Sequence, residues 1–216
     1  KSWLASTVEL NINQSLSRLK TDYVDLLQIH SCSLDVLKKG EIIEGLIKIK
    51  ESGKTRFIGY AGDNEAAAYA MSLGVFDTLQ TSYNLVDQKA RLDLFPLIKK
   101  QNLGLIVKRP IANAAWRSKK KIFVGFSDYF DDSYKERANE MIALGPLSNE
   151  PDNSIELALG YALSEKIVDT AIVGTKDDKH LLSNINLVKD GINLDKKLIN
   201  ELKSRFDKLG DNWIQM

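Results

Sequence analysis

The sequence predicts an α/β protein whose β-strands run parallel to one another. Segments with helical periodicity alternate with short apolar segments along the whole chain. The segments between successive strands are long enough for a helix, and parallel strands need such crossover connections. Polar residues follow each predicted strand. In parallel α/β folds these positions are where ligands bind, so the pattern also indicates a functional edge.

Composition limits the classes of function. The chain has 216 residues, which is enough for one substantial core, and its net charge of +1 provides no basic field for nucleic acid or an anionic membrane. Cys32 is the single cysteine, which excludes an internal disulfide and a cysteine-ligated zinc. No segment approaches the roughly 20 apolar residues that cross a bilayer, and the first residues lack a secretion signal. We therefore expect a soluble cytoplasmic protein with neither nucleic-acid nor membrane partners.

The first half of the sequence contains three predicted strands. Leu4, Val8, Ile12 and Leu16 recur at the spacing of an amphipathic helix before the first strand. That strand, YVDLLQIH, is apolar enough to be covered on both faces. The predicted elements are, in order, a helix over residues 4–19, a strand over 23–30, a helix over 41–53, a strand over 55–60, a helix over 64–74 and a strand over 76–82.

The second half adds two more strands and a long insertion. Residues 111–150 are too many for an ordinary connection, so we interpret them as a long loop and a candidate lid over a cofactor. The other predicted elements are a helix over residues 92–102, a strand over 103–110, a helix over 154–166, a strand over 169–174 and helices over 179–189 and 194–210.

Five parallel strands fit either an open, doubly wound sheet or part of an eight-stranded barrel. A doubly wound nucleotide-binding fold shows a glycine-rich turn after an early strand, but neither GxGxxG nor GxxxxGK occurs here. In a barrel, the polar residues that follow the strands meet at one mouth, where active sites lie. The sequence therefore favours a (β/α)8 barrel of which this chain contains about five strands.

Two of the strand-end residues are candidates for direct chemistry. His30 ends the first predicted strand and is one of two histidines. It is either a hydrogen-bonded structural residue or an active-site imidazole that binds a carbonyl oxygen or transfers a proton near neutral pH. Gln80 ends the third predicted strand, where its amide either bonds to the backbone or binds a flat polar ligand.

Cations follow the fourth and fifth strands. Lys108 and Arg109 either extend to solvent or bind phosphate, for which the guanidinium geometry is well suited. In AIVGTKDDKHLLSN the fifth strand ends at Gly174 and a helix begins near Asp177 or Asp178. Barrel phosphate sites lie at such turns. Here Thr175, Lys176 and His180 supply a hydroxyl, an ammonium and an imidazole.

Five segments, in this order and spacing, resemble the aldo-keto reductase superfamily: TDYVDLLQIH, IGYAGD, DTLQTSYN, VKRPIAN and AIVGTKDDKHLLSNI. The resemblance runs from the helix before the fourth barrel strand to the C-terminus, so residues 1–216 correspond to the C-terminal two-thirds of the family's TIM barrel. It implies a nicotinamide cofactor, NADP(H) with NAD(H) as the alternative. It also implies a small carbonyl substrate, an aldehyde or ketone that is reduced to the alcohol by hydride transfer.

The resemblance also implies roles for particular residues. His30 matches the histidine that orients the substrate carbonyl, and Gln80 matches the glutamine that binds the nicotinamide carboxamide. Ala61 and Gly62 stand where many members carry a Ser-Asn pair. The other implied cofactor-binding residues are Lys108, Arg109, Pro110 and Ile111 near the nicotinamide and pyrophosphate, and Gly174, Thr175, Lys176, His180 and Asn184 around the adenosine 2′-phosphate and adenine.

Two departures from the family pattern bear on function. Many members have an aromatic residue at Lys108 and an arginine at His180, so the preference between NADPH and NADH stays open. The family's catalytic tyrosine, lysine and aspartate lie on its first three strands, which would precede residue 1. We expect that about 100 residues of a complete barrel are absent and that this chain alone is inactive. The alternatives are a non-catalytic, cofactor-binding regulatory module of the same fold and an unrelated phosphate-binding barrel enzyme.

Overall fold

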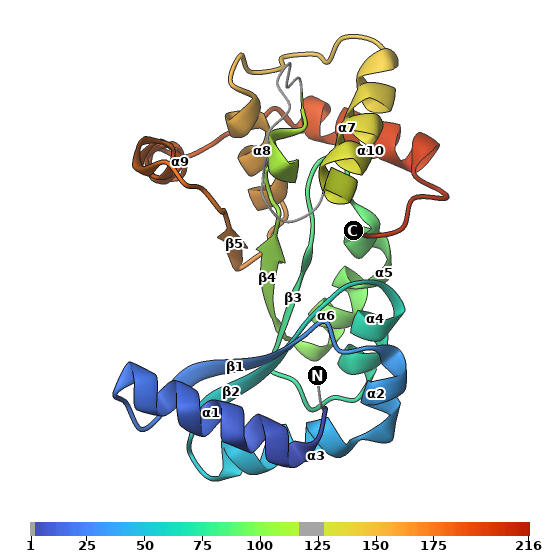
Figure 1. Ribbon diagram of the computed structural model, residues 1–216. Helices are drawn as coiled ribbons and strands as arrows, with labels where there is room; N and C mark the ends of the chain where they lie inside the picture. The colour runs from blue at the N-terminus through green and yellow to red at the C-terminus, as the bar shows by residue number, and fades with distance from the viewer. Residues whose placement is uncertain (1–2, 117–127) are drawn as a thin grey trace. The chain divides into compact units, whose positions relative to one another are not determined.

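The computed structural model describes residues 3–116 and 128–216, and the chain divides into two compact units. Unit 1 contains the residues up to Thr81 together with Asp93–Leu105, and unit 2 contains Ser82–Leu92 and Ile106–Met216. Five strands form one sheet in sequence order, β1-β2-β3-β4-β5 (Figure 1). The pairs β1–β2, β2–β3 and β4–β5 are parallel, which confirms the predicted α/β class.

Unit 1 is built around β1 and β2, which α1 and α3 cover on one face (Figure 1). Ile12 and Leu16 of α1 pack against Ile49 of α3 in one apolar cluster. Gly45 permits the close approach of the two helices, since a Cβ there would lie 2.9 Å from the Cα of Ala5. The elements of unit 1 are α1 (Ala5–Leu19), β1 (Val24–His30), α2 (Leu34–Lys39), α3 (Glu41–Glu51), β2 (Thr55–Ala61), α4 (Asn64–Ser72) and α6 (Phe95–Gln101).

The boundaries between the two units fall inside two strands and one short helix. Those elements are β3 (Thr78–Ser82), α5 (Lys89–Asp93) and β4 (Gly104–Lys108). The single helix predicted over residues 92–102 is therefore wrong, because α5 ends at Asp93 and α6 begins at Phe95. Pro96 stands in the first turn of α6, where its missing N–H costs no helical hydrogen bond.

Unit 2 has its core around α8, whose residues Leu157–Ala162 are all buried. Arg205 of α10 is also buried, and its guanidinium donates to the carbonyl oxygens of Met141, Gly145 and Pro146 at 2.7–3.0 Å. These bonds satisfy carbonyls that follow α7 or end it, which have no helical partner. The elements of unit 2 are a 3₁₀ turn (Ala112–Ala114), α7 (Asp128–Ala143), α8 (Ser154–Leu163), β5 (Thr170–Ile172), α9 (Asp178–Asp190) and α10 (Lys196–Leu209).

The segment predicted as a long loop, residues 111–150, contains regular structure. It includes the 3₁₀ turn and the whole of α7, which packs against α10. Residues 117–127 of the segment lie outside the part of the chain that the structure describes. Ala112, Asn113 and Ala114 all have left-handed φ values between 48° and 56°, which is rare for residues with a Cβ.

Candidate functional site

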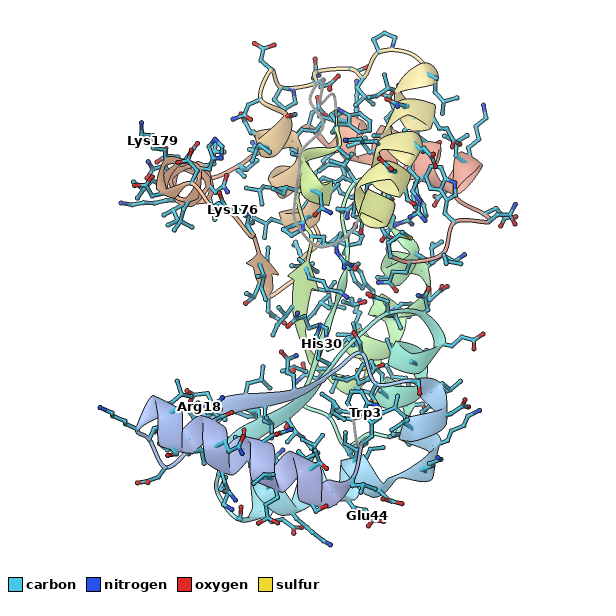
Figure 2. The ribbon with its side chains drawn as sticks, viewed as in Figure 1. Trp3, Arg18, His30, Glu44, Lys176 and Lys179 are labelled. Atoms are coloured by element: carbon cyan, nitrogen blue, oxygen red, sulfur yellow. The ribbon has the colours of Figure 1, made fainter. Side chains whose placement is uncertain are left out.

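In unit 1, the two residues predicted for direct chemistry lie in one row across three strands. His30 of β1 is in register with Ala61 of β2, and Ala61 is in register with Gln80 of β3. Residues in register share a face of a parallel sheet, so His30 and Gln80 flank the small Ala61 on one face. His30 is exposed and Gln80 is half-buried, so both side chains are accessible to a ligand (Figure 2 labels His30).

Hydrogen bonds connect the loops that directly follow His30, Ala61 and Gln80. The Ser31 amide donates to the Ala61 carbonyl at 2.8 Å, and the Gly62 amide donates to the Gln80 carbonyl at 3.0 Å. The Thr81 hydroxyl donates to Asp63 Oδ1 at 2.9 Å. Ser31 also turns the chain sharply, with a left-handed φ of 55°. These bonds continue the sheet's ladder into the loops and hold the strand ends in a fixed arrangement.

The structure leaves no room for a side chain at Gly62. Tyr60 is 1% exposed, and its hydroxyl donates to the Cys32 carbonyl at 2.7 Å. The ring held in this way lies against Gly62, where a Cβ would come within 2.7 Å of it. An asparagine at this position is therefore excluded sterically while Tyr60 keeps its place.

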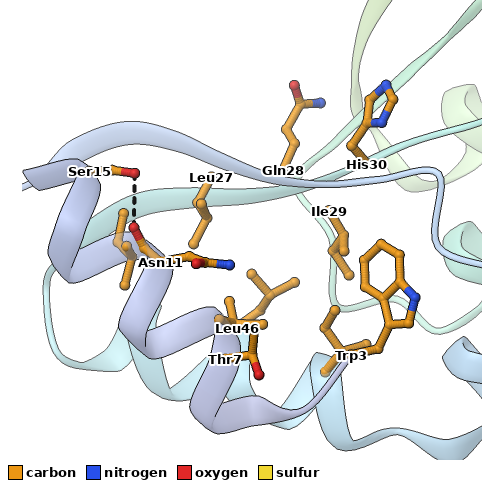
Figure 3. A pocket seen from close by; sticks show the side chains of 12 residues that line it. Trp3, Thr7, Asn11, Ser15, Leu27, Gln28, Ile29, His30 and Leu46 are labelled. Carbon is orange, nitrogen blue, oxygen red and sulfur yellow. Dashed lines mark hydrogen bonds between the residues drawn. The ribbon is translucent and has the colours of Figure 1, made fainter. Parts of the chain in front are cut away.

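A cavity of about 380 Å³ lies between α1 and β1 in unit 1 (Figure 3). Leu27 and Ile29 line it from the helix-facing side of β1, Leu46 lines it from α3, and Trp3 closes one end. Gln28 and His30 border it, but their side chains project from the opposite side of the strand. Because its lining is mainly apolar, this cavity contributes no reactive group beyond His30, which belongs to the row described above.

In unit 2, Arg109 is placed at the end of β4 with its guanidinium on two oxygen acceptors. Arg109 Nη1 donates to Ser82 Oγ at 2.9 Å and to the Met216 carbonyl oxygen at 2.7 Å. Its own carbonyl accepts from Asn84 Nδ2 at 3.0 Å, and its φ of 55° is left-handed. Lys108 before it is half-buried, Pro110 is buried and Ile111 is half-buried. Ser82 is a residue that the sequence analysis missed.

The turn after β5 and the first turn of α9 contain four of the predicted residues, Gly174, Thr175, Lys176 and His180. The carboxylates of Asp177 and Asp178 already cap the N-terminus of α9. The Lys179 amide donates to both Asp177 Oδ1 and Asp178 Oδ1 at 2.9 Å. Thr175 Oγ1 accepts from the Asp177 amide at 3.2 Å, and His180 Nε2 lies 3.9 Å from Asp177 Oδ2.

The side chains around this turn are accessible. Lys176 extends into solvent, as does Lys179 on the first turn of α9 (Figure 2). Gly174, Thr175 and His180 are also exposed, whereas Asn184, one turn further along α9, is half-buried.

Four buried tyrosines are unsuited to donate a proton to a substrate. Burial raises the pKa of Tyr60, Tyr83, Tyr134 and Tyr161, because a phenolate loses its hydration inside the protein. The Tyr60 hydroxyl is bonded to the Cys32 carbonyl, and the Tyr134 hydroxyl donates to Asp87 Oδ2 at 3.1 Å. None of the four takes the place of an activated catalytic tyrosine.

Within residues 3–116 and 128–216, no cluster of three or more histidine, cysteine, aspartate or glutamate residues could hold a metal ion. Across the same ranges no helix is both long enough and apolar enough to span a membrane.

Known proteins resemble this chain in both sequence and structure. The chain is 26% identical over 209 residues to L-galactose dehydrogenase from Arabidopsis thaliana, which covers 93% of this chain and 64% of that protein. It is 26% identical over 181 residues to the uncharacterized oxidoreductase YqkF from Bacillus subtilis, covering 81% of this chain and 58% of that one. This chain therefore spans less than two-thirds of the length of these relatives.

A solved structure supports the barrel. The holo form of the aldo-keto reductase AKR11C1 from Bacillus halodurans superposes with a TM-score of 0.75 at 22% identity, covering 95% of this chain and 68% of that one. This confirms the predicted fold, an aldo-keto reductase type of (β/α)8 barrel present here in part.

The family model that matches this sequence is that of the aldo/keto reductase family, and it covers residues 5–205. The predicted extent of the resemblance, which ran to the C-terminus and was described as the C-terminal two-thirds, is wrong in detail because the match stops within α10. The match nevertheless spans all five strands and most of the chain. The chain therefore belongs to the aldo/keto reductase family.

Proposed function

We propose that the protein is an NAD(P)H-dependent oxidoreductase that reduces an aldehyde or ketone to the alcohol. The observation that carries the proposal is the row of His30, Ala61 and Gln80 at the carboxyl ends of three neighbouring parallel strands. An accessible imidazole and an accessible amide on one sheet face suit a carbonyl and a planar carboxamide. When bound, the nicotinamide supplies the hydride for this chemistry.

Taken by itself, unit 2 offers residues that suit the phosphate groups of a nucleotide. Arg109 and Ser82 already hold an oxygen acceptor, and a guanidinium binds phosphate oxygens more strongly than neutral ones. At the turn before α9, Asp177 and Asp178 place negative charge where a 2′-phosphate was predicted. In Rossmann-fold proteins that use NAD, a carboxylate accepts hydrogen bonds from the ribose hydroxyls, and the same chemistry is possible here. We therefore propose that NADH binds at least as well as NADPH.

The carbonyl-reducing step also needs a proton donor. Its predicted source, a tyrosine beside a lysine and an aspartate, has no counterpart in this sequence, and the buried tyrosines have raised pKa values. We propose that His30 orients the carbonyl and that the 216-residue chain alone gives no turnover. A non-catalytic, cofactor-binding role is the second candidate, since the proposed nucleotide-binding residues do not depend on a proton donor.

The test measures nucleotide binding separately from turnover. NADH and NADPH are titrated against the purified protein, and the fluorescence of the reduced nicotinamide is followed. Gln80→Ala is expected to weaken binding by roughly fivefold to tenfold, the effect of one lost hydrogen bond. Gln28→Ala is the control, because Gln28 lies on the same face two residues earlier and is expected to leave binding unchanged. Equal losses in the two variants, or no binding by the parent protein, would contradict the proposal.

The two candidate roles are separated by a second assay with a simple aromatic aldehyde. Nicotinamide oxidation by a form of the protein that contains the family's tyrosine, lysine and aspartate supports the reductase. Tight nucleotide binding without turnover in that form supports the regulatory module.

A further inference from the structure

The last residues of the sequence are anchored in unit 2 along their whole length. We use the term tail for residues 213–216. The Trp213 ring packs edge-on against Phe206, with centroids 5.6 Å apart, and the Arg137 guanidinium lies 5.2 Å from its centre. Arg137 Nη2 also donates to the Ile214 carbonyl at 2.8 Å. A cation–π contact and a hydrogen bond from one arginine thus hold the first half of the tail.

The second half of the tail is buried and makes three further contacts. Gln215 Nε2 donates to the Ser82 carbonyl at 2.7 Å, and the Met216 amide donates to Asp87 Oδ2 at 2.9 Å. The Met216 carbonyl oxygen accepts from both Arg109 Nη1 and Ser82 Oγ. Gln215 is 4% exposed and Met216 is 6% exposed. The oxygen of Met216 therefore stands where a guanidinium and a hydroxyl converge.

Arg109 and Ser82 are placed as an oxyanion-binding pair would be. Ser82 is the last residue of β3, and Arg109 directly follows the last residue of β4. Arg109 is half-buried rather than enclosed, so a ligand can reach it. A pyrophosphate group carries several negative charges and presents oxygens to both donors, and charge-assisted bonds to a guanidinium are the strong ones. A pyrophosphate group is therefore a stronger acceptor for this pair than one oxygen of the tail.

We propose that the tail is a displaceable plug of the Arg109–Ser82 pair and that a pyrophosphate-bearing ligand competes with the Met216 oxygen. The inference rests on the proposed function, which places the nucleotide's pyrophosphate at Arg109. The plugged form cannot offer both donors to a phosphate. The apparent affinity for the ligand is thus reduced by the fraction of molecules whose tail is docked.

The test weakens the tail without touching the pair. Gln215→Ala removes the bond to the Ser82 carbonyl and leaves both side chains of the pair intact. The dissociation constant for inorganic pyrophosphate, measured by titration calorimetry, is expected to fall about fivefold, as one hydrogen bond shifts the docking equilibrium. Gln101→Ala is the matched control, because Gln101 Nε2 makes the same kind of bond to the Met71 carbonyl at 2.8 Å in unit 1. The dissociation constant of Gln101→Ala for pyrophosphate is expected to equal that of the parent protein.

Two variants give results that would overturn the proposal. An unchanged or increased dissociation constant in Gln215→Ala means that the tail supports the site or is irrelevant to it. Arg109→Gln is expected to raise the constant at least tenfold, as expected when a charge-assisted bond is lost. An unchanged constant in that variant also overturns the proposal, as does a parent protein that does not bind pyrophosphate.

A measurement on the unsubstituted protein covers the case in which Gln215→Ala does not fold. Fluorotryptophan is incorporated, and the Trp213 resonance is assigned by its loss in Trp213→Phe. Saturating pyrophosphate is expected to move this resonance toward its solvent-exposed position, whereas a resonance that stays in place overturns the proposal.

The same signal separates this inference from the proposed function. If pyrophosphate releases the tail but neither NADH nor NADPH binds, the proposed function fails and the plug stands. If the nucleotides bind while the tail stays docked, the plug fails and the proposed function stands.

Discussion

At the scale of single residues, His30 is the side chain on which the proposed chemistry depends most directly. It ends β1 beside Ala61 and is exposed, so its removal leaves no cavity and costs the fold little. In the active protein, His30→Ala is expected to lower kcat by about 10²–10³-fold, the range for the loss of one hydrogen-bond donor to the reacting carbonyl oxygen. The dissociation constant of the nucleotide should change much less. Parallel losses in kcat and nucleotide affinity would indicate a structural role instead.

Gly62 offers a second prediction, on stability. Gly62→Ala places a Cβ 2.7 Å from the Tyr60 ring, which its bond to the Cys32 carbonyl keeps from moving away. We expect the free energy of unfolding to fall by about 1–3 kcal/mol, as for other overpacked sites. Gly174→Ala is the control, because nothing lies within 4 Å of a Cβ there. Urea denaturation of both variants checks this, and equal stability of the two would refute the steric argument.

Asp177 and Asp178 determine the expected preference between nucleotides. Asp177→Asn keeps an oxygen that can cap α9 and removes one negative charge. The affinity for NADPH is expected to rise about fivefold relative to NADH, because an exposed charge a few ångströms from a phosphate contributes about 1 kcal/mol. Asp190→Asn, at the other end of α9, is the control for net charge. The dissociation constants for NADPH and NADH are measured for each variant. An unchanged ratio of the two in Asp177→Asn would mean that the 2′-phosphate does not bind at this turn.

At the scale of elements, the N-terminus of α10 carries a pH-dependent cap. The Lys197 amide donates to Asp195 Oδ1, and Asn149 Nδ2 donates to Oδ2, both at 2.8 Å. These bonds lower the pKa of the Asp195 carboxyl, because they favour its ionised form. A lowered pKa in the folded state stabilises the protein above the unfolded-state value of about 3.9. The contribution is lost as the pH falls through the folded-state pKa.

Asp195→Asn tests this, since it keeps a capping oxygen without the charge. Its Tm should be lower than that of the parent protein near neutral pH, and the difference should shrink as the pH falls below about 4 and vanish below the lowered folded-state pKa. Thermal melts across this range measure the difference. A Tm difference that does not depend on pH would mean that the carboxylate charge is not responsible.

The elements also show what the sequence could and could not predict. Apolar runs and helical stripes predicted all five strands, because local burial decides both patterns. The break between α5 and α6 was missed, since Leu94 and Phe95 continue the apolar stripe through it. Strand order predicted that His30 and Gln80 would share an edge. Their place in one row depends on register, which the crossover helices set.

Other site contacts had no signal in the sequence at all. Arg109 meets Ser82 and Met216 across 27 and 107 residues, and no local pattern reports such a contact. The resemblance predicted that Gly62 departs from the family pattern, and it gave no cause for the departure. The cause, a Tyr60 ring held by a bond to Cys32, is a matter of tertiary packing.

At the scale of the whole molecule, the sheet order leaves two strands with one neighbour each. Within the described residues β1 and β5 stand at the ends of the order, whereas a closed barrel gives every strand two neighbours. On the face of the sheet that carries His30, Gln28 Nε2 of β1 and Thr78 Oγ1 of β3 are buried without a hydrogen-bond partner. Both converge over Gly59, since a Cβ at Gly59 would lie 2.2 Å from the Thr78 hydroxyl and 3.1 Å from the Gln28 nitrogen. In a complete barrel, further strands supply side chains to that interior.

A polypeptide limited to these 216 residues is therefore expected to self-associate or to unfold broadly, since unpaired strand edges invite pairing. Light scattering across a range of concentrations, together with a thermal melt, tests this. A sharp, reversible transition of a monomer would contradict it.

Thr78→Val adds a sharper comparison. In the isolated polypeptide it should be neutral or stabilise by about 1 kcal/mol, because it removes a buried hydroxyl that has no partner. In a form that closes the barrel, the same change should destabilise if the added strands bond to that hydroxyl, so the sign of the effect reports whether the interior is complete.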